Sequence, residues 1–93
     1  MIVGLLTLDL HIHESHSLKE KRLVIKSLID RIKNKFNVSA AEVDANDLWQ
    51  RSIIGIACVS NETAMINKVF DQIKNIVIST HSVELINATT ELL

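Results

Sequence analysis

This chain of 93 residues has no proline, no tyrosine, only two glycines and a single cysteine. With proline and glycine so scarce, its turns must be made by Asn, Asp, Ser and His. Cys58 alone cannot form an internal disulfide, which agrees with a reducing compartment. No apolar run reaches the roughly 18–20 residues that a membrane span needs. The first residues also lack the basic start of a signal peptide, so we expect a cytoplasmic protein without a membrane partner.

The sequence also lacks the motifs that are typical of several functional classes. The sequence contains no Walker loop, no dinucleotide-binding fingerprint and no Cys-x-x-Cys pair. Aromatic residues make up 3% of the chain, so the aromatic platform with which an RRM sheet stacks on bases is missing. We expect no cofactor and a non-enzymatic role, although the sequence leaves catalysis open.

Hydrophobic periodicity predicts the order strand, helix, strand, strand, helix, strand. Apolar and polar residues alternate over 2–12, as in a strand with one buried face. Helical spacing covers 17–36, where Ser17 and Glu20 have the spacing of a capping box, and a second helix is expected after a cap at Asn61. The other predicted strands are 38–44, 49–60 and 83–92, and the nearly continuous apolar run in 49–60 indicates a central strand.

This element order is typical of the ferredoxin-like α+β fold, βαββαβ, in a single domain over residues 1–93. Both helices would pack on one face of a four-stranded antiparallel sheet. The first and third strands would be central neighbours and would contain Gly4 and Gly55. The other face, with Val3, Leu5 and Thr7, would have no helix to cover it. An uncovered and partly apolar face implies a partner, most simply a second copy of the chain.

Positive charge is concentrated in residues 17–36. This segment carries seven basic residues against two acids, a charge of +5 in a chain whose total is −1. Helical spacing arranges Lys19, Arg22, Lys26 and Lys33 as a stripe on one face. Such a stripe could contact the phosphates of RNA. A solvated surface helix explains the same pattern.

The segment 47–51 contains the only tryptophan, Trp49, close to Arg51. Both residue types are common anchors of interfaces, and both can stack on bases. The alternative is structural: Trp49 closes one end of a small core while Arg51 pairs with Asp44 or Asp47.

Three histidines near the end of the first strand raise the question of a metal site. His11 and His13 should share a strand face and could bind an ion together with Glu14 or His16. Their spacing matches no standard zinc motif, so the sequence predicts no metal site.

The acids Glu42, Asp44 and Asp47 are close in sequence, and the first two are expected on one strand face. Without a nucleophile or a phosphate loop nearby, a polar sheet edge is a better interpretation than a catalytic carboxylate pair. Cys58 lies in an apolar run and is expected to be a small buried hydrophobe.

Several short motifs together resemble the YlxP-like family of small bacterial proteins, a domain of unknown function. They are SLKEKR (17–22), NKFNVS (34–39), EVD (42–44), DLWQR (47–51) and VSN (59–61). The resemblance implies a ferredoxin-like fold and a bacterial cytoplasmic protein. Relatives are often encoded beside transcription and translation factors, which implies association with RNA or the ribosome. The resemblance implies no active site, and Ala45 and Asn46 stand where many relatives have His and Gln.

The leading hypothesis is therefore an accessory protein that binds RNA or a ribonucleoprotein. Its expected contacts are Lys19, Arg22, Lys26 and Lys33 together with Trp49 and Arg51. The alternative is a protein-interaction or homodimerisation module that uses the open face of the sheet.

Overall fold

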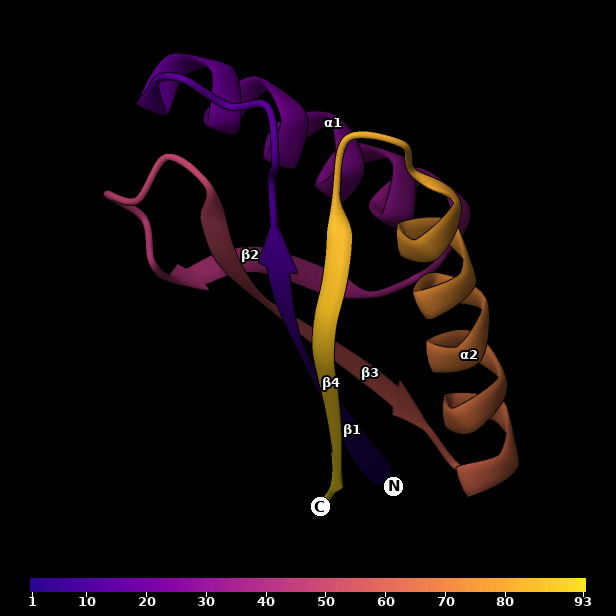
Figure 1. Ribbon diagram of the computed structural model, residues 1–93. Coiled ribbons are helices and arrows are strands. Elements are labelled where there is room, and N and C mark those ends of the chain that lie inside the picture. Colours follow the sequence, from indigo (N-terminus) through magenta and orange to yellow (C-terminus); the bar gives the residue numbers. More distant parts are fainter.

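The computed structural model describes residues 1–93 and confirms the predicted order of elements (Figure 1). The elements are β1 (Ile2–His11), α1 (Leu18–Lys35), β2 (Ser39–Asp44), β3 (Arg51–Ser60), α2 (Thr63–Ser79) and β4 (Glu84–Leu92). The strands form one antiparallel sheet in the order β2-β3-β1-β4, so β1 and β3 are the central pair as expected. Because β1 and β4 run antiparallel as neighbours, the two chain ends lie close together (Figure 1).

Both helices cover the same face of the sheet, and the core lies between them and the strands. Alternate residues of β1 and β3, such as Leu8 and its partner Ile54, are fully buried. They pack with apolar positions of the helices, including Ile32 of α1 and Phe70 of α2. The apolar faces that the two-residue period predicts for the strands and the 3.6-residue period predicts for the helices therefore pack together in one core. Cys58 is buried, as predicted.

Gly4 allows α2 to approach β1 closely. A Cβ atom at this position would overlap Cγ2 of Ile66 and lie 3.0 Å from the ring of Phe70, and both side chains are buried. The close approach that a strand glycine suggests is therefore real. The second strand glycine, Gly55, lies on the open face of the sheet, where a Cβ would meet only Val43.

The helix ends agree with the sequence at α1 and differ at α2. Oγ of Ser17 accepts a hydrogen bond from the N–H of Glu20, and the Glu20 carboxylate accepts one from the N–H of His16. These two reciprocal hydrogen bonds cap the N-terminus of α1. The expected cap of α2 at Asn61 is wrong, because Glu62 is the N-cap and its side chain makes no capping bond. Neither helix combines the length and the apolar character that a membrane crossing needs.

Two irregularities interrupt the alternation of the edge strands. In the β2–β3 pair the register shifts between Glu42 and Asp44. In the β1–β4 pair it shifts beside Asp9 and Leu10. Each bulge moves the following side chains to the other face of the strand, and both affect polar residues discussed below.

Candidate functional site

The basic residues predicted to bind RNA lie on the outer surface of α1. Lys19, Arg22, Lys26 and Lys33 are all exposed, and we call them the basic stripe. Viewed along the helix axis, at 3.6 residues per turn, these four residues fall within an arc of about 60°. The centre of this arc lies about 120° around the helix from the buried residues Lys21, Ile25, Leu28 and Ile32. Lys26 forms an ion pair with Asp30 at 2.7 Å, whereas the other three have no acidic partner among the six ion pairs of the structure.

The opposite flank of α1 faces α2. There Arg31 donates to Oγ1 of Thr80, the residue that ends α2, at 3.4 Å. Lys35 lies over the ring of Phe36 with its Nζ 5.7 Å from the ring centroid. The basic stripe therefore occupies the flank of α1 that points away from α2, where nothing in the chain covers it.

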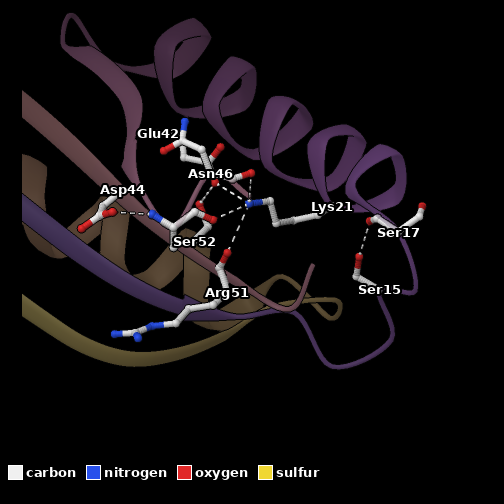
Figure 2. A network of polar contacts seen from close by, with 9 residues as sticks. Ser15, Ser17, Lys21, Glu42, Asp44, Asn46, Arg51 and Ser52 are labelled. Carbon is white, nitrogen blue, oxygen red and sulfur yellow. Dashed lines mark hydrogen bonds and ion pairs between the residues drawn. The ribbon is translucent and has the colours of Figure 1, made fainter. Parts of the chain in front are cut away.

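Lys21 is the one basic residue of α1 that does not reach the surface. Its side chain is completely buried, and its ammonium forms an ion pair with Glu42 at 3.0 Å. The same ammonium donates to the backbone carbonyls of Ala45 (2.8 Å), Asn46 (3.0 Å) and Arg51 (3.3 Å). Figure 2 shows the oxygens of Glu42, Asn46 and Arg51 directed toward Nζ. With Lys21 removed from the seven basic residues and the two acids kept, the exposed charge of residues 17–36 is +4 rather than +5.

Glu42 is part of this buried network and not of a polar sheet edge. Its carboxylate accepts a hydrogen bond from Oγ of the buried Ser52 at 2.5 Å in addition to the ion pair with Lys21. The prediction that Glu42 and Asp44 share a strand face is wrong, because the bulge pairs Glu42 with Ile54 and Asp44 with Ile53. These two isoleucines point to opposite faces of β3.

The Lys21 network holds the turn between β2 and β3 from inside. Ala45 adopts a left-handed conformation with φ 59°, and its carbonyl accepts the N–H of Leu48 as well as the Lys21 ammonium. Trp49 follows in this turn and remains 54% exposed, so the alternative that it closes the core is wrong. It lines a surface hollow with Leu48, Gln50 and Arg51 on one side and His11, Ser15 and His16 on the other.

Arg51 lies on the open face of the sheet. Its guanidinium donates two hydrogen bonds to the Asp9 carboxylate, at 3.2 and 2.9 Å. These hydrogen bonds, and next the charge of Asp9, raise the pKa of Arg51 above its ordinary value. The expected partners Asp44 and Asp47 are therefore replaced by Asp9, and Asp44 contributes only a smaller charge effect.

The structure does not bring all predicted contact residues together. The α1 helix lies on one face of the sheet (Figure 1). The Arg51 guanidinium lies on the other face, where its charge is paired with that of Asp9. The four residues of the basic stripe share one surface, whereas Trp49 and Arg51 share the hollow beside His11.

The open face of the sheet is apolar along its middle. Leu5, Ala41, Val43 and Ala57 border a shallow hollow above Gly55, which has no side chain to fill it. Val59, at the end of β3, is 60% exposed. The expectation of an uncovered and partly apolar face is confirmed.

In the structure, His11 and His13 are close together and His16 lies apart from them. His11 and His13 lie together, with ring centroids 4.2 Å apart, and their nearest acid is Glu84 of β4. Glu14 and His16, expected as further ligands, are not members of this group. Sequence reasoning missed Glu84 because it lies about 70 residues away in the chain.

The sheet order and the layer of two helices define the class of protein: a ferredoxin-like α+β fold. Two solved structures of de novo designed proteins share it, one described as having a ferredoxin fold (LFR1 1) and the other named Foldit4. Each has a TM-score of 0.58 and 12% identity over the whole chain, which covers 84% and 97% of those proteins. At this identity the likeness shows the fold alone.

The chain belongs to the family described as "Protein of unknown function (DUF503)", whose model matches residues 3–90. It is 36% identical over 90 residues to the uncharacterized protein YlxP of Bacillus subtilis (strain 168). This match covers 97% of the chain and 98% of the relative. The predicted family resemblance is confirmed, and the function of the family is unknown.

Proposed function

We propose that this protein is a cytoplasmic, non-enzymatic accessory protein that binds RNA or a ribonucleoprotein through the basic stripe of α1. The observation that carries the proposal is the position of the stripe along the helix. Lys33 lies in the last turn, where the helix dipole favours a positive charge. Lys19 lies in the first turn, where the same dipole opposes it, so helix stability does not account for this residue.

The electrostatic state of the stripe also supports binding of a polyanion. Lys19, Arg22 and Lys33 are free of acidic partners, so no intramolecular pair must break before they reach a phosphate. The exposed pair between Lys26 and Asp30 is an (i, i+4) pair, which contributes only about 0.3–0.5 kcal/mol. All four side chains can therefore contact phosphates with little loss of intramolecular interaction energy.

Trp49 and Arg51 take a secondary place in this proposal. Trp49 is exposed enough to stack on a base, but the hollow that contains it opens beside the open face of the sheet. An RNA that contacts both surfaces would have to pass around the end of the sheet near the β2–β3 turn. The primary contacts are therefore those of the basic stripe.

A pull-down from cells, with and without nuclease, tests the proposal. The comparison uses the wild type, a stripe variant (Arg22→Ala, Lys26→Ala, Lys33→Ala) and a control of equal charge change (Arg31→Ala, Lys68→Ala, Lys74→Ala). RNA should be recovered with the wild type and the control and lost with the stripe variant, and nuclease should release any co-purified proteins. Equal recovery with both variants, or no RNA at all, would contradict the proposal.

A second candidate is a homodimerisation or protein-interaction module on the open sheet face. The specific observation in its favour is the exposure of apolar side chains there, including Val43 (59%) and Val59 (60%). Sedimentation velocity at micromolar concentration would show a dimer that Val59→Lys dissociates. The matched control is Ile78→Lys, since Ile78 is 65% exposed on α2 and lies away from this face. A wild type that is strictly monomeric and recovers no protein would argue against this candidate.

A further inference from the structure

Three potential metal ligands meet at the end of the sheet where β1 leads into the loop before α1. Nε2 of His13 lies 2.5 Å from Oε2 of Glu84, and Nδ1 of His11 lies 4.0 Å from the same oxygen. All three donor atoms lie within 4.8 Å of one another. We propose that His11, His13 and Glu84, the His–His–Glu cluster, bind a divalent transition-metal ion such as zinc.

The bulge in the β1–β4 pair is what brings Glu84 to the histidines. From Gly4 to Asp9 the two strands pair in one register, and continuing that register would place Leu85 opposite His11. The extra residue in β4 instead places Leu85 opposite the buried Leu10 and Glu84 opposite His11. The bulge thus turns Leu85 toward the core in place of Ile86, which is exposed, and places the Glu84 carboxylate on the open face. Bulges that redirect one side chain in this way are frequent beside functional sites.

The spacing of the donors fits a zinc ion after small side-chain movements. Zinc binds imidazole nitrogen and carboxylate oxygen at about 2.0–2.2 Å, so two ligands at the tetrahedral angle are about 3.3–3.5 Å apart. The distances from Glu84 to the two histidines, 2.5 and 4.0 Å, bracket this value. Both histidines and Glu84 are at least partly exposed, so rotation of their side chains meets little resistance. His11 ends β1 and His13 lies in the turn that follows, with the two ring centroids already 4.2 Å apart, so the backbone need not move far.

The surrounding charges permit a cation at this place. Arg51 lies opposite His11 on β3 and would repel a metal ion if its charge were free. Its guanidinium is turned to Asp9 and held there by two hydrogen bonds, so the pair is close to neutral. Glu84 supplies the negative charge that two neutral imidazoles lack.

The donor set also indicates the kind of site. Two imidazoles and one carboxylate are suited to zinc and related transition metals, and less to calcium or magnesium, which prefer oxygen ligands. Three protein ligands leave a fourth position for water or a small ligand. His13 and Glu84 are each 53% exposed, so this position would open to solvent. The proposal departs from the sequence-based expectation of no metal, which considered only ligands close together in the chain.

Calorimetric titration of the full chain, freed of any affinity tag, with zinc tests the proposal. We expect one zinc per chain, with affinity lowered at least about tenfold by His13→Ala or Glu84→Gln, because even the loss of a residue that only supports a ligand costs 10–100-fold. His81→Ala is the matched control, since it removes an exposed histidine outside the cluster and should leave the affinity unchanged.

Cobalt in place of zinc gives a second readout, because its visible absorption should change in the His13→Ala and Glu84→Gln variants and not in the control. Circular dichroism establishes that each variant is folded. The absence of saturable zinc binding, a loss of less than tenfold in either cluster variant, or an equal loss in His81→Ala would overturn the proposal.

Discussion

Replacing Lys21 with methionine should remove a large part of the stability of this fold, although the residue belongs to a strongly charged helix. Methionine keeps most of the buried side-chain volume but leaves the Glu42 carboxylate and three backbone carbonyls without the ammonium. Breaking a buried ion pair by removing one partner costs about 3–5 kcal/mol. Because Glu42 keeps 15% exposure and the bond from Ser52, we expect a loss near the lower limit, about 3 kcal/mol.

Urea unfolding followed by circular dichroism measures this loss. A chain of 93 residues has a free energy of unfolding of about 5–14 kcal/mol, so the variant should still fold. At an m-value of about 1–3 kcal/mol/M, its midpoint should fall by at least about 1 M. The matched control is Lys26→Met on the exposed side of the same helix, which should change the stability by no more than about 0.5 kcal/mol.

The double variant Lys21→Met, Glu42→Gln separates charge from packing. Removing the uncompensated carboxylate should restore part of the stability that Lys21→Met loses, which gives a coupling energy in a double-mutant cycle. If Lys21→Met loses no more stability than Lys26→Met, the buried ion pair does not stabilise the fold. The same conclusion follows if neutralising Glu42 restores none of the lost stability.

Two further predictions concern the sheet. Gly4→Ala should lower the free energy of unfolding by about 1–3 kcal/mol, because its Cβ would overlap the buried Ile66. Gly55→Ala should lower it by less than about 0.5 kcal/mol, because the exposed Val43 can move. Equal losses of the two variants in urea unfolding would contradict this difference. Because the pKa of Arg51 is raised, its guanidinium stays charged from neutral pH to pH 10, and its pairing with Asp9 persists over the same range. Asp9→Asn should therefore lower the stability equally at pH 7 and pH 10, and a difference that shrinks at pH 10 would contradict the assignment.

Much of the fold could be predicted from the sequence because its core uses regular periods. The alternation in residues 2–12 and the helical spacing in 17–36 both survive in the structure, with boundaries shifted by one or two residues. The missed residue, Lys21, lies on the apolar row of α1, four positions before Ile25 and seven before Leu28. From this spacing alone, the burial of Lys21 could have been predicted. It was missed because a lysine is counted as surface by its type, and only the tertiary contact with Glu42 and the turn carbonyls makes its burial favourable.

The errors at the polar sites have a different cause. A bulge inserts one residue and reverses which face the next side chain occupies, and a period-two pattern does not reveal it. For this reason the sequence pattern wrongly predicts that Asp44 lies beside Glu42 on one strand face. Partners that are distant in sequence, such as Asp9 for Arg51 and Glu84 for His13, depend on strand order and register together. The composition of the candidate surfaces could thus be predicted, but the grouping of their residues could not.

The salt dependence of RNA binding shows whether the basic stripe contacts phosphates. Fluorescence anisotropy of a labelled single-stranded RNA would give the affinity of the wild type, the stripe variant and the charge-matched control across a range of salt concentrations. Each phosphate contact contributes about −0.7 to the slope of log K against log salt. The wild-type slope should therefore be near −3 from the four basic residues, and the stripe variant should be flatter by about 2 while the control keeps the wild-type slope. Equal slopes for the stripe variant and the control, or no measurable binding by the wild type at low salt, would show that the basic stripe does not bind RNA.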